Sequence, residues 1–215
     1  MEADTWLADT RSSYDTVADS YADQLREALA GEPHLRAALA LFAETVRTAG
    51  GGPVADVGCG PGHVTAHLRD LGVDAFGIDL SPAMVEVARR DHPGLRFDVG
   101  SMTDLDLADA SAGALLAFWS LVHVPDGAIP AVFTEFRRVL RPGAPVMLGF
   151  HMGEGSRLKT QGYGGHPMKV HVHRRPPDRV TTWLHDAGFR VQAQWLLDLD
   201  ESLPGAILFA RRDNR

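Results

Sequence analysis

Cysteine and long apolar runs are what this 215-residue sequence has least of. Its single cysteine, Cys59, cannot form a disulfide bond within the chain. No run of about 18 apolar residues is present that could cross a bilayer. The first residues, Met1-Glu2-Ala3-Asp4, lack the basic and then apolar order of a signal peptide. We therefore expect a cytoplasmic protein that has no membrane partner.

Basic charge is also scarce. The sequence has 21 Lys and Arg residues against 28 Asp and Glu residues, which gives a formal net charge of −7. Its short basic pairs, such as Arg174-Arg175 and Arg211-Arg212, are scattered. Nucleic-acid binding usually needs a basic face, because phosphate contacts supply most of its affinity. We therefore expect a small-molecule substrate, no nucleic-acid partner, and a monomer or a homodimer.

The sequence offers little for a metal site. His171 and His173 are two residues apart on a predicted strand, so they share one face, which metal ligands also do. The spacing fixes no third ligand, and neighbouring Lys169 and Arg174 favour a solvated edge. We expect no metal.

The amounts of apolar and charged residues, 45% and 23%, are ordinary for a globular protein, and the length suits one domain with a sizeable core. We expect a single domain over 1–215. Its predicted parts are an N-terminal helical lid at 1–50, a cofactor-binding core at 51–150, a substrate-loop insertion at 151–175, and a closing helix and strands at 176–215.

Apolar strands and amphipathic helices alternate through the middle of the sequence. We predict strands at 53–57, 74–79, 95–99, 113–118 and 144–150, and helices at 61–71, 82–91 and 127–139. This alternation predicts an α/β fold, doubly wound, with a mostly parallel sheet and helices on both faces. Ligands of such sheets bind beyond the carboxyl ends of the strands.

The two ends of the sequence add elements outside this alternation. Apolar spacing predicts helices at 12–30, capped by Ser12-Ser13, and at 33–48. After 151 we predict a glycine-rich loop that acts as a mobile lid, then strand-like residues at 168–173, a helix at 176–187, and strands at 189–197 and 205–211.

Three glycines, Gly58, Gly60 and Gly62, follow the first predicted strand and precede a helix. Glycine lets the backbone turn sharply and places no Cβ between the turn and a bound molecule. The positive end of the next helix favours a carboxylate or a phosphate above it. The stretch therefore predicts a cofactor site.

The spacing separates the cofactor classes. A phosphate loop of the Walker type needs Gly-Lys-Ser/Thr, and this chain has His63-Val64-Thr65. The last glycine of a dinucleotide motif is replaced by His63 or Thr65, which weakens that alternative. Asp79 ends the second predicted strand about 20 residues after Gly58, where an acid can bind both hydroxyls of a ribose.

These residues resemble the class I S-adenosylmethionine-dependent methyltransferases, in sequence order over most of the chain. The further matches are residues 97–102, 115–124 and 138–143. The resemblance implies a seven-stranded sheet whose last strands form an antiparallel pair, with S-adenosylmethionine as cofactor and S-adenosylhomocysteine as product. Many relatives carry Asp where Ser101 stands. The expected cofactor-binding residues are Tyr14, Tyr21, Asp56, Gly58, Cys59, Gly60, Asp79, Leu80, Met84, Ser101, Met102, Phe118 and Trp119.

Three histidines are the candidate catalytic residues. His123 follows the fourth strand, and its ordinary pKa of about 6.5 suits proton abstraction near neutral pH. A structural hydrogen bond is its alternative role. His151, after the fifth strand, and His166, in the insertion, come next.

We expect transfer of a methyl group to an oxygen or nitrogen atom of a small metabolite. Two alternatives stay open: a nicotinamide-dependent oxidoreductase, and a protein that binds S-adenosylmethionine without methylating.

Overall fold

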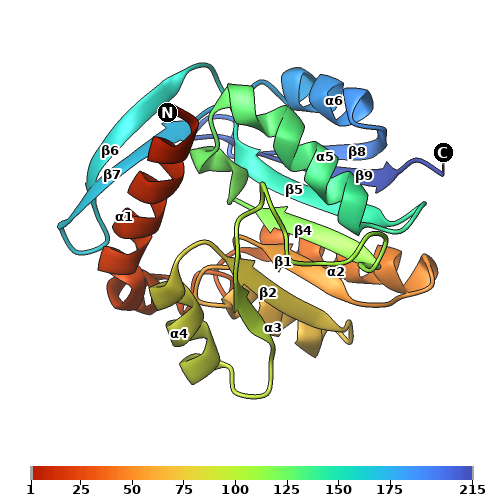
Figure 1. Ribbon diagram of the computed structural model, residues 1–215, viewed down its shortest axis with the longest axis horizontal. Helices are drawn as coiled ribbons and strands as arrows, with labels where there is room; N and C mark the ends of the chain where they lie inside the picture. Colours follow the sequence, from red (N-terminus) through yellow and green to blue (C-terminus); the bar gives the residue numbers. More distant parts are fainter. Residues whose placement is uncertain (1, 215) are drawn as a thin grey trace.

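The computed structural model describes residues 2–214, which form one seven-stranded sheet between helices (Figure 1). The order of its strands is β3-β2-β1-β4-β5-β9-β8. The first five strands pair in parallel, and β9 is antiparallel to both of its neighbours, β5 and β8. The strands are β1 Val54–Val57, β2 Ala75–Asp79, β3 Phe97–Val99, β4 Ala114–Phe118, β5 Pro145–His151, β8 Phe189–Leu197 and β9 Gly205–Arg212. The predicted fold class is confirmed.

Helices cover both faces of the sheet, as its alternating side chains require. Ala114 and Leu116 of β4 pack with α2 (Pro33–Thr48) and α3 (His63–Asp70). Leu115 and Ala117 point the other way, toward α5 (Ile129–Val139) and α6 (Pro177–Asp186). Helix α4 (Pro82–Asp91) lies beside β2 and β3.

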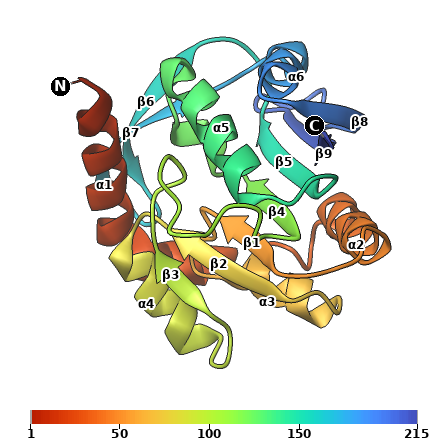
Figure 2. The ribbon, with the colours of Figure 1, turned by 45° about the vertical axis from the view of Figure 1, so that its right-hand side comes forward.

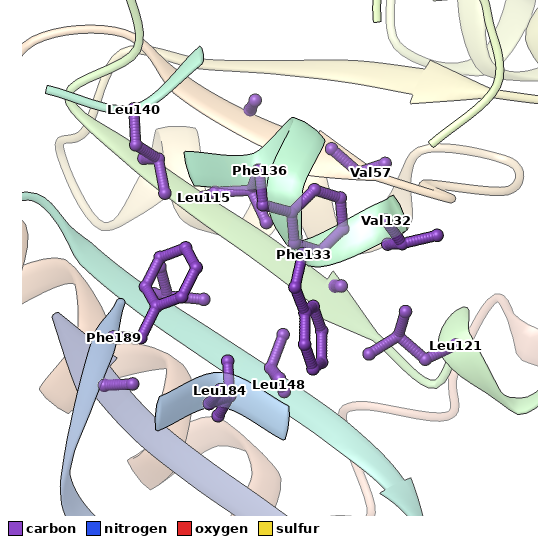
Figure 3. Close-up of a cluster of buried hydrophobic side chains, with 14 of the residues drawn as sticks. Val57, Leu115, Leu121, Val132, Phe133, Phe136, Leu140, Leu148, Leu184 and Phe189 are labelled. Carbon is purple, nitrogen blue, oxygen red and sulfur yellow. The ribbon is translucent and has the colours of Figure 1, made fainter. Parts of the chain in front are cut away.

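The larger cluster of buried apolar residues lies under α5 and α6 (Figure 3). Helix α5 presents its apolar residues three and four positions apart, so they form one stripe facing the sheet. Figure 3 shows the ring of Phe133 near Leu148 of β5, and Phe136 and Leu184 of α6 belong to the same cluster. This packing fixes β4 and β5, and with them the loops that leave their carboxyl ends.

The first helix is longer at its start than the sequence suggested. Helix α1 spans Glu2–Leu25, so the predicted start at Ser12-Ser13 is wrong, and the helix ends before the predicted residue 30. Ser13 is buried inside the helix, and its Oγ accepts a hydrogen bond from the backbone N–H of Lys169 at 2.8 Å. The sequence alone does not distinguish a serine that binds a distant strand from a serine that caps a helix, which explains the wrong prediction of the helix start.

Part of the expected glycine-rich loop after β5 is a strand, β6 (Ser156–Gly162), which forms a hairpin with β7 (His166–His173). Strand β7 confirms the strand predicted at 168–173. The loop prediction for 156–162 was wrong because β6 lacks the apolar alternation of a half-buried strand. Figures 1 and 2 both place this hairpin beside α1, and α1 contacts β7.

Phe136→Ala is expected to lower the free energy of unfolding by about 3–5 kcal/mol, because the removed ring leaves a cavity between α5 and the sheet. Urea denaturation followed by circular dichroism measures this change. Leu41→Ala is the control: its side chain is 41% exposed, and we expect a loss of about 1 kcal/mol or less. Equal losses for the two variants would contradict the assignment of the core.

Candidate active site

A cavity of about 620 Å³ lies beyond the carboxyl ends of β1, β2, β4 and β5 and is covered by α1 and β6. This volume is in the range of small-molecule sites. The position is the one that parallel sheets of this kind use for their ligands.

The glycine turn after β1 forms one wall of this cavity. Gly58 has φ +77°, and a Cβ there would lie 2.2 Å from Cβ of Ser120, so the loop after β4 requires glycine. Gly60 has φ +55°, and the nearest atom to a Cβ there is Cε1 of Tyr21 at 3.7 Å. A larger side chain at residue 60 would therefore project into the cavity, toward Tyr21.

Asp79 joins the glycine turn to the end of β2. Its Oδ2 accepts a hydrogen bond from the N–H of Gly60 and its Oδ1 one from the N–H of Ser81, both at 2.8 Å. Each carboxylate oxygen keeps one lone pair for a ligand hydroxyl. Burial raises the pKa of Asp79, and the two N–H groups oppose this shift. This wall therefore presents carboxylate acceptors to a ligand that carries hydroxyl groups.

Asp56 is buried at the end of β1 and lines the same wall. Its Oδ2 accepts a hydrogen bond from the Thr65 hydroxyl at 2.6 Å. Burial raises the pKa of Asp56 to about 7, although the Thr65 bond lowers it and the charge of Asp79 raises it further. Cys59 is also buried, and burial raises the pKa of its thiol, so it stands protonated at neutral pH.

Helix α1 covers the cavity and is tied to both of its sides. Oδ1 of Asp15 accepts hydrogen bonds from Oγ of Ser81 at 2.5 Å and from the N–H of Ala83 at 3.2 Å, on α4 and the loop before it. Ser13 binds β7, as described above. Tyr14 lies between them and meets Tyr21 edge to face at a centroid distance of 5.7 Å.

Tyr14 and His123 form a hydrogen-bonded pair inside the cavity. Nδ1 of His123 lies 2.8 Å from the carbonyl oxygen of His171, and only a protonated Nδ1 can donate to it. The neutral ring therefore has its lone pair on Nε2, which accepts a hydrogen bond from the Tyr14 hydroxyl at 2.6 Å. Burial lowers the pKa of His123 to about 4 and raises that of Tyr14.

His123 lies on a short 3-10 helix, η1 (Leu121–His123), which a buried arginine holds. Arg175 is 2% exposed and donates to the carbonyl oxygens of Leu121 and Val124 and, at 2.9 Å, to Oδ1 of Asp126. Its guanidinium therefore fixes the loop between β4 and α5 on both sides of His123.

Trp119 and His151 form a second pair, at the ends of β4 and β5. Trp119 has φ +54°, a conformation that a large side chain rarely adopts outside functional or tightly held sites. Its Nε1–H donates to Nδ1 of His151 at 3.3 Å, so the neutral imidazole carries its proton on Nε2. Burial, and then the charge of Arg174, lower the pKa of His151 to about 4. His151 is thus arranged as a hydrogen-bond donor.

Two of the sixteen predicted site residues lie outside the cavity lining. Met84 is fully buried in a cluster with Val17 and Val87, on the side of α4 that faces α1. His166 is exposed at the start of β7. The residues that do line the cavity are Tyr14, Tyr21, Asp56, Gly58, Cys59, Gly60, Asp79, Leu80, Ser101, Met102, Phe118, Trp119, His123 and His151.

Several lining residues were missed in the sequence. Arg157, Lys159 and Gln161 of β6 all line the cavity, as do Arg11 of α1 and Arg174 after β7. The alternation of long polar residues along 157–161 was the available signal, since residues two apart on a strand share a face.

Residues 54–143 match the family model described as a methyltransferase domain. These residues span β1 to the turn before β5, which includes the glycine turn and Asp79. The match lies where the resemblance was expected, and that resemblance is confirmed.

The proteins similar to the chain include two curated relatives and one solved structure. The malonyl-[acyl-carrier protein] O-methyltransferase of Pectobacterium atrosepticum is 31% identical over 116 residues, 49% of this chain and 45% of that relative. The ubiquinone biosynthesis O-methyltransferase of Xanthomonas axonopodis pv. citri is 28% identical over 155 residues, 66% of this chain and 64% of that relative. The chain therefore spans less than half the length of the first relative.

The solved structure is the 1,6-didemethyltoxoflavin-N1-methyltransferase of Burkholderia thailandensis with 1,6-didemethyltoxoflavin and S-adenosylhomocysteine bound. It superimposes with a TM-score of 0.73 at 21% identity, over 98% of this chain and 90% of that one. At this identity the likeness shows the fold, including the N-terminal helix and the closing strands.

Within residues 2–214, no helix is both long and apolar enough to cross a membrane. Among the side chains of residues 5–214, no group of three or more His, Cys, Asp or Glu is placed to hold a metal ion.

Asp56→Asn is expected to stabilise the protein at pH 8 more than at pH 5. The folded-state pKa of Asp56 is raised to about 7, so its contribution to stability is complete below about pH 4 and is lost as the pH rises through about 7. An amide removes that loss, by up to about 4 kcal/mol, while keeping an acceptor for Thr65. Urea denaturation at both pH values measures the difference. Asp200→Asn, exposed between β8 and β9, is the control; the same pH dependence in both variants would contradict the assignment.

Proposed function

We propose that the chain is a class I S-adenosylmethionine-dependent methyltransferase and that it methylates an oxygen or nitrogen atom of a small-molecule metabolite. The observation that carries the proposal is the direct bond between the glycine turn and Asp79 in a cavity large enough for a cofactor and an acceptor. The two O-methyltransferases and the N-methyltransferase described above support an oxygen or nitrogen acceptor.

The cofactor of this family is S-adenosylmethionine, which supplies a methyl group activated on a sulfonium. Gly58, Gly60 and Asp79 are proposed to hold its amino acid and ribose, and Leu80 and Met102 to contact its adenine. Ser101 donates or accepts a 2.7 Å hydrogen bond with the Thr103 hydroxyl, so its role toward adenine is weaker than that of an aspartate.

The protein's main contribution to such a transfer is alignment in a site closed to water. Positioning is worth about 7–11 kcal/mol, whereas a general base contributes about 10²–10⁴-fold. Helix α1 and the β6–β7 hairpin enclose the site. The aromatic rings of Tyr14, Tyr21 and Tyr163 form a continuous wall on this side.

Tyr14 and His123 provide a proton path for an acceptor that must lose a proton. The acceptor donates to Oη of Tyr14 as the phenolic proton passes to Nε2 of His123. This changes two expectations for His123. It acts through Tyr14 rather than on the acceptor itself, and with its pKa lowered to about 4 it is a weaker base than an ordinary histidine, although it stays unprotonated at neutral pH. His151 donates from Nε2 and orients the acceptor.

The nicotinamide-dependent alternative has no support from the family match. A protein that binds S-adenosylmethionine without methylating would share the cofactor site and differ only in turnover. To separate a methyltransferase from a protein that only binds S-adenosylmethionine, the protein is incubated with S-adenosylmethionine and a panel of metabolites. Formation of S-adenosylhomocysteine, detected by mass spectrometry, identifies a methyltransferase.

In a calorimetric titration, the protein should bind S-adenosylmethionine and S-adenosylhomocysteine in preference to NAD. Asp79→Ala should weaken this binding by at least about tenfold, because two charge-assisted hydrogen bonds to the ribose are lost. Gly60→Val should abolish it by filling the turn. Gly127→Val, where a Cβ meets open space, is the control. Preference for NAD, or unchanged binding by both folded variants, would refute the assigned site.

Tyr14→Phe and His123→Asn should each lower single-turnover rates by about 10²–10⁴-fold at neutral pH for a hydroxyl acceptor, with affinity for S-adenosylhomocysteine within about threefold of wild type. Asparagine keeps a donor toward the His171 carbonyl while removing Nε2. The double variant should be no slower than either single one, because the two groups form one path. Part of the rate should return at high pH. Additive losses, or weaker cofactor binding without recovery, would indicate a structural role.

A further inference from the structure

On strand β6 the charged side chains face the cavity and an apolar side chain faces away from it, which is the reverse of the usual arrangement in a hairpin. Antiparallel sheets normally turn apolar residues toward the protein and polar residues toward water. On β6, Arg157 and Lys159 line the cavity, while Leu158 between them is 44% exposed on the other face. Strand β7 follows the usual rule, with Met168 and Val170 buried. The inversion is therefore particular to the strand that faces the cavity.

The cations on this face have no carboxylate partner among the side chains that the structure describes, those of residues 5–214. No side-chain hydrogen bond or ion pair joins Arg157 or Arg174 to another described residue. Nζ of Lys159 lies 3.9 Å from the ring centroid of Tyr163, a contact that leaves its charge unneutralised. Glu154, the nearest acid in sequence, instead pairs with Arg179 at 3.6 Å.

Pairing in the hairpin brings the two arginines together. Arg157 is opposite Val172 in the β6–β7 register, and the N–H of Arg174 binds the carbonyl oxygen of Gly155 at 2.9 Å. Arg157, Val172 and Arg174 thus lie side by side, and all three line the cavity.

Two of these cations lie near the histidines of the cavity. Arg174 is close enough to His151, and Lys159 to His123, for their charges to lower the pKa values of those imidazoles, after the larger effect of burial. The carboxylates that line the cavity are Asp56 and Asp79, at the ends of β1 and β2, and Glu32, before α2.

Like charges gathered on one face repel one another, which costs stability unless an anion lies between them. We propose that the acceptor is a small carboxylic acid whose carboxylate is bound by Arg157 and Arg174, with Lys159 beside them. This inference rests on the proposed methyl transfer and names the class of its acceptor. Arginine binds a carboxylate through two parallel hydrogen bonds, so two arginines fix both the position and the orientation of that group.

The apolar lining of the cavity suits an apolar body attached to the carboxylate. Val172 lies beside Arg157, and Trp6, Leu7, Val122 and Leu203 line the same cavity. A hydrocarbon or aromatic acid buries its body against these side chains while its charge meets the arginines. We therefore expect monocarboxylates of moderate size to bind better than small, strongly hydrated ones.

The test compares acids with their uncharged amides on the full chain saturated with S-adenosylhomocysteine. The probes are phenylacetate with phenylacetamide and hexanoate with hexanamide, and the readouts are thermal unfolding and calorimetric titration. Each acid should raise the unfolding temperature more than its amide. Arg157→Gln and Arg174→Gln should each weaken acid binding by about tenfold or more, because glutamine lacks the positive charge and cannot make both parallel hydrogen bonds.

The control is Arg190→Gln, which makes the same charge change at an exposed site on β8 outside the cavity lining. It should leave acid binding unchanged. Without acid, Arg157→Gln should be as stable as wild type or more stable, since it relieves repulsion; a purely structural arginine predicts the opposite sign.

Four outcomes would overturn the proposal: equal effects of acids and amides, no effect of any acid, stabilisation by phenyl phosphate alone, or loss of S-adenosylhomocysteine affinity in the arginine variants. The last would assign the arginines to the carboxylate of the cofactor. The initial titration with S-adenosylhomocysteine is read separately. Its failure would refute the proposed function, whereas normal cofactor binding with no preference for acids would refute only the acceptor class.

Discussion

The hydrogen bond from the Gly60 N–H to the Asp79 carboxylate is the interaction on which the site depends. It joins the loop that leaves β1 to the end of β2, so two neighbouring parallel strands present one continuous ligand surface. Asp79 is half-buried, and backbone N–H groups from both segments bind its carboxylate and oppose the rise in pKa that burial causes. The cradle is therefore held in shape by the protein's own bonds before a cofactor enters.

The sequence predicted the parts of the fold whose signals are local. Glycine spacing, apolar runs and the acid after the second strand are read within a few residues, and they placed Gly58, Gly60 and Asp79 correctly at the cavity. The antiparallel closing strands came from family resemblance rather than from any pattern in the chain. Strand β6 was missed because its inner face is charged, so the apolar alternation that marks a strand is absent.

What the sequence could not reveal are pairs of side chains far apart in the chain. Tyr14 and His123 are 109 residues apart, and only the position of α1 over η1 brings them together. The same contact explains why His123 looked like a free base: its Nε2 is engaged by a residue that spacing alone cannot locate. Met84 shows the converse, since a helical position facing the cofactor by family analogy here faces α1.

The successive residues Ser13, Tyr14 and Asp15 bind β7, His123 and the start of α4. In a helix, consecutive side chains point in directions about 100° apart, so three neighbouring residues can bind three different elements around one helix. Rotation or withdrawal of α1 breaks all three contacts together, and we expect the helix to move away as a unit. The cofactor product and the methylated product would then both leave through the same opening, which forms when α1 moves away. Movement of α1 would therefore limit the rate of both releases and set their order.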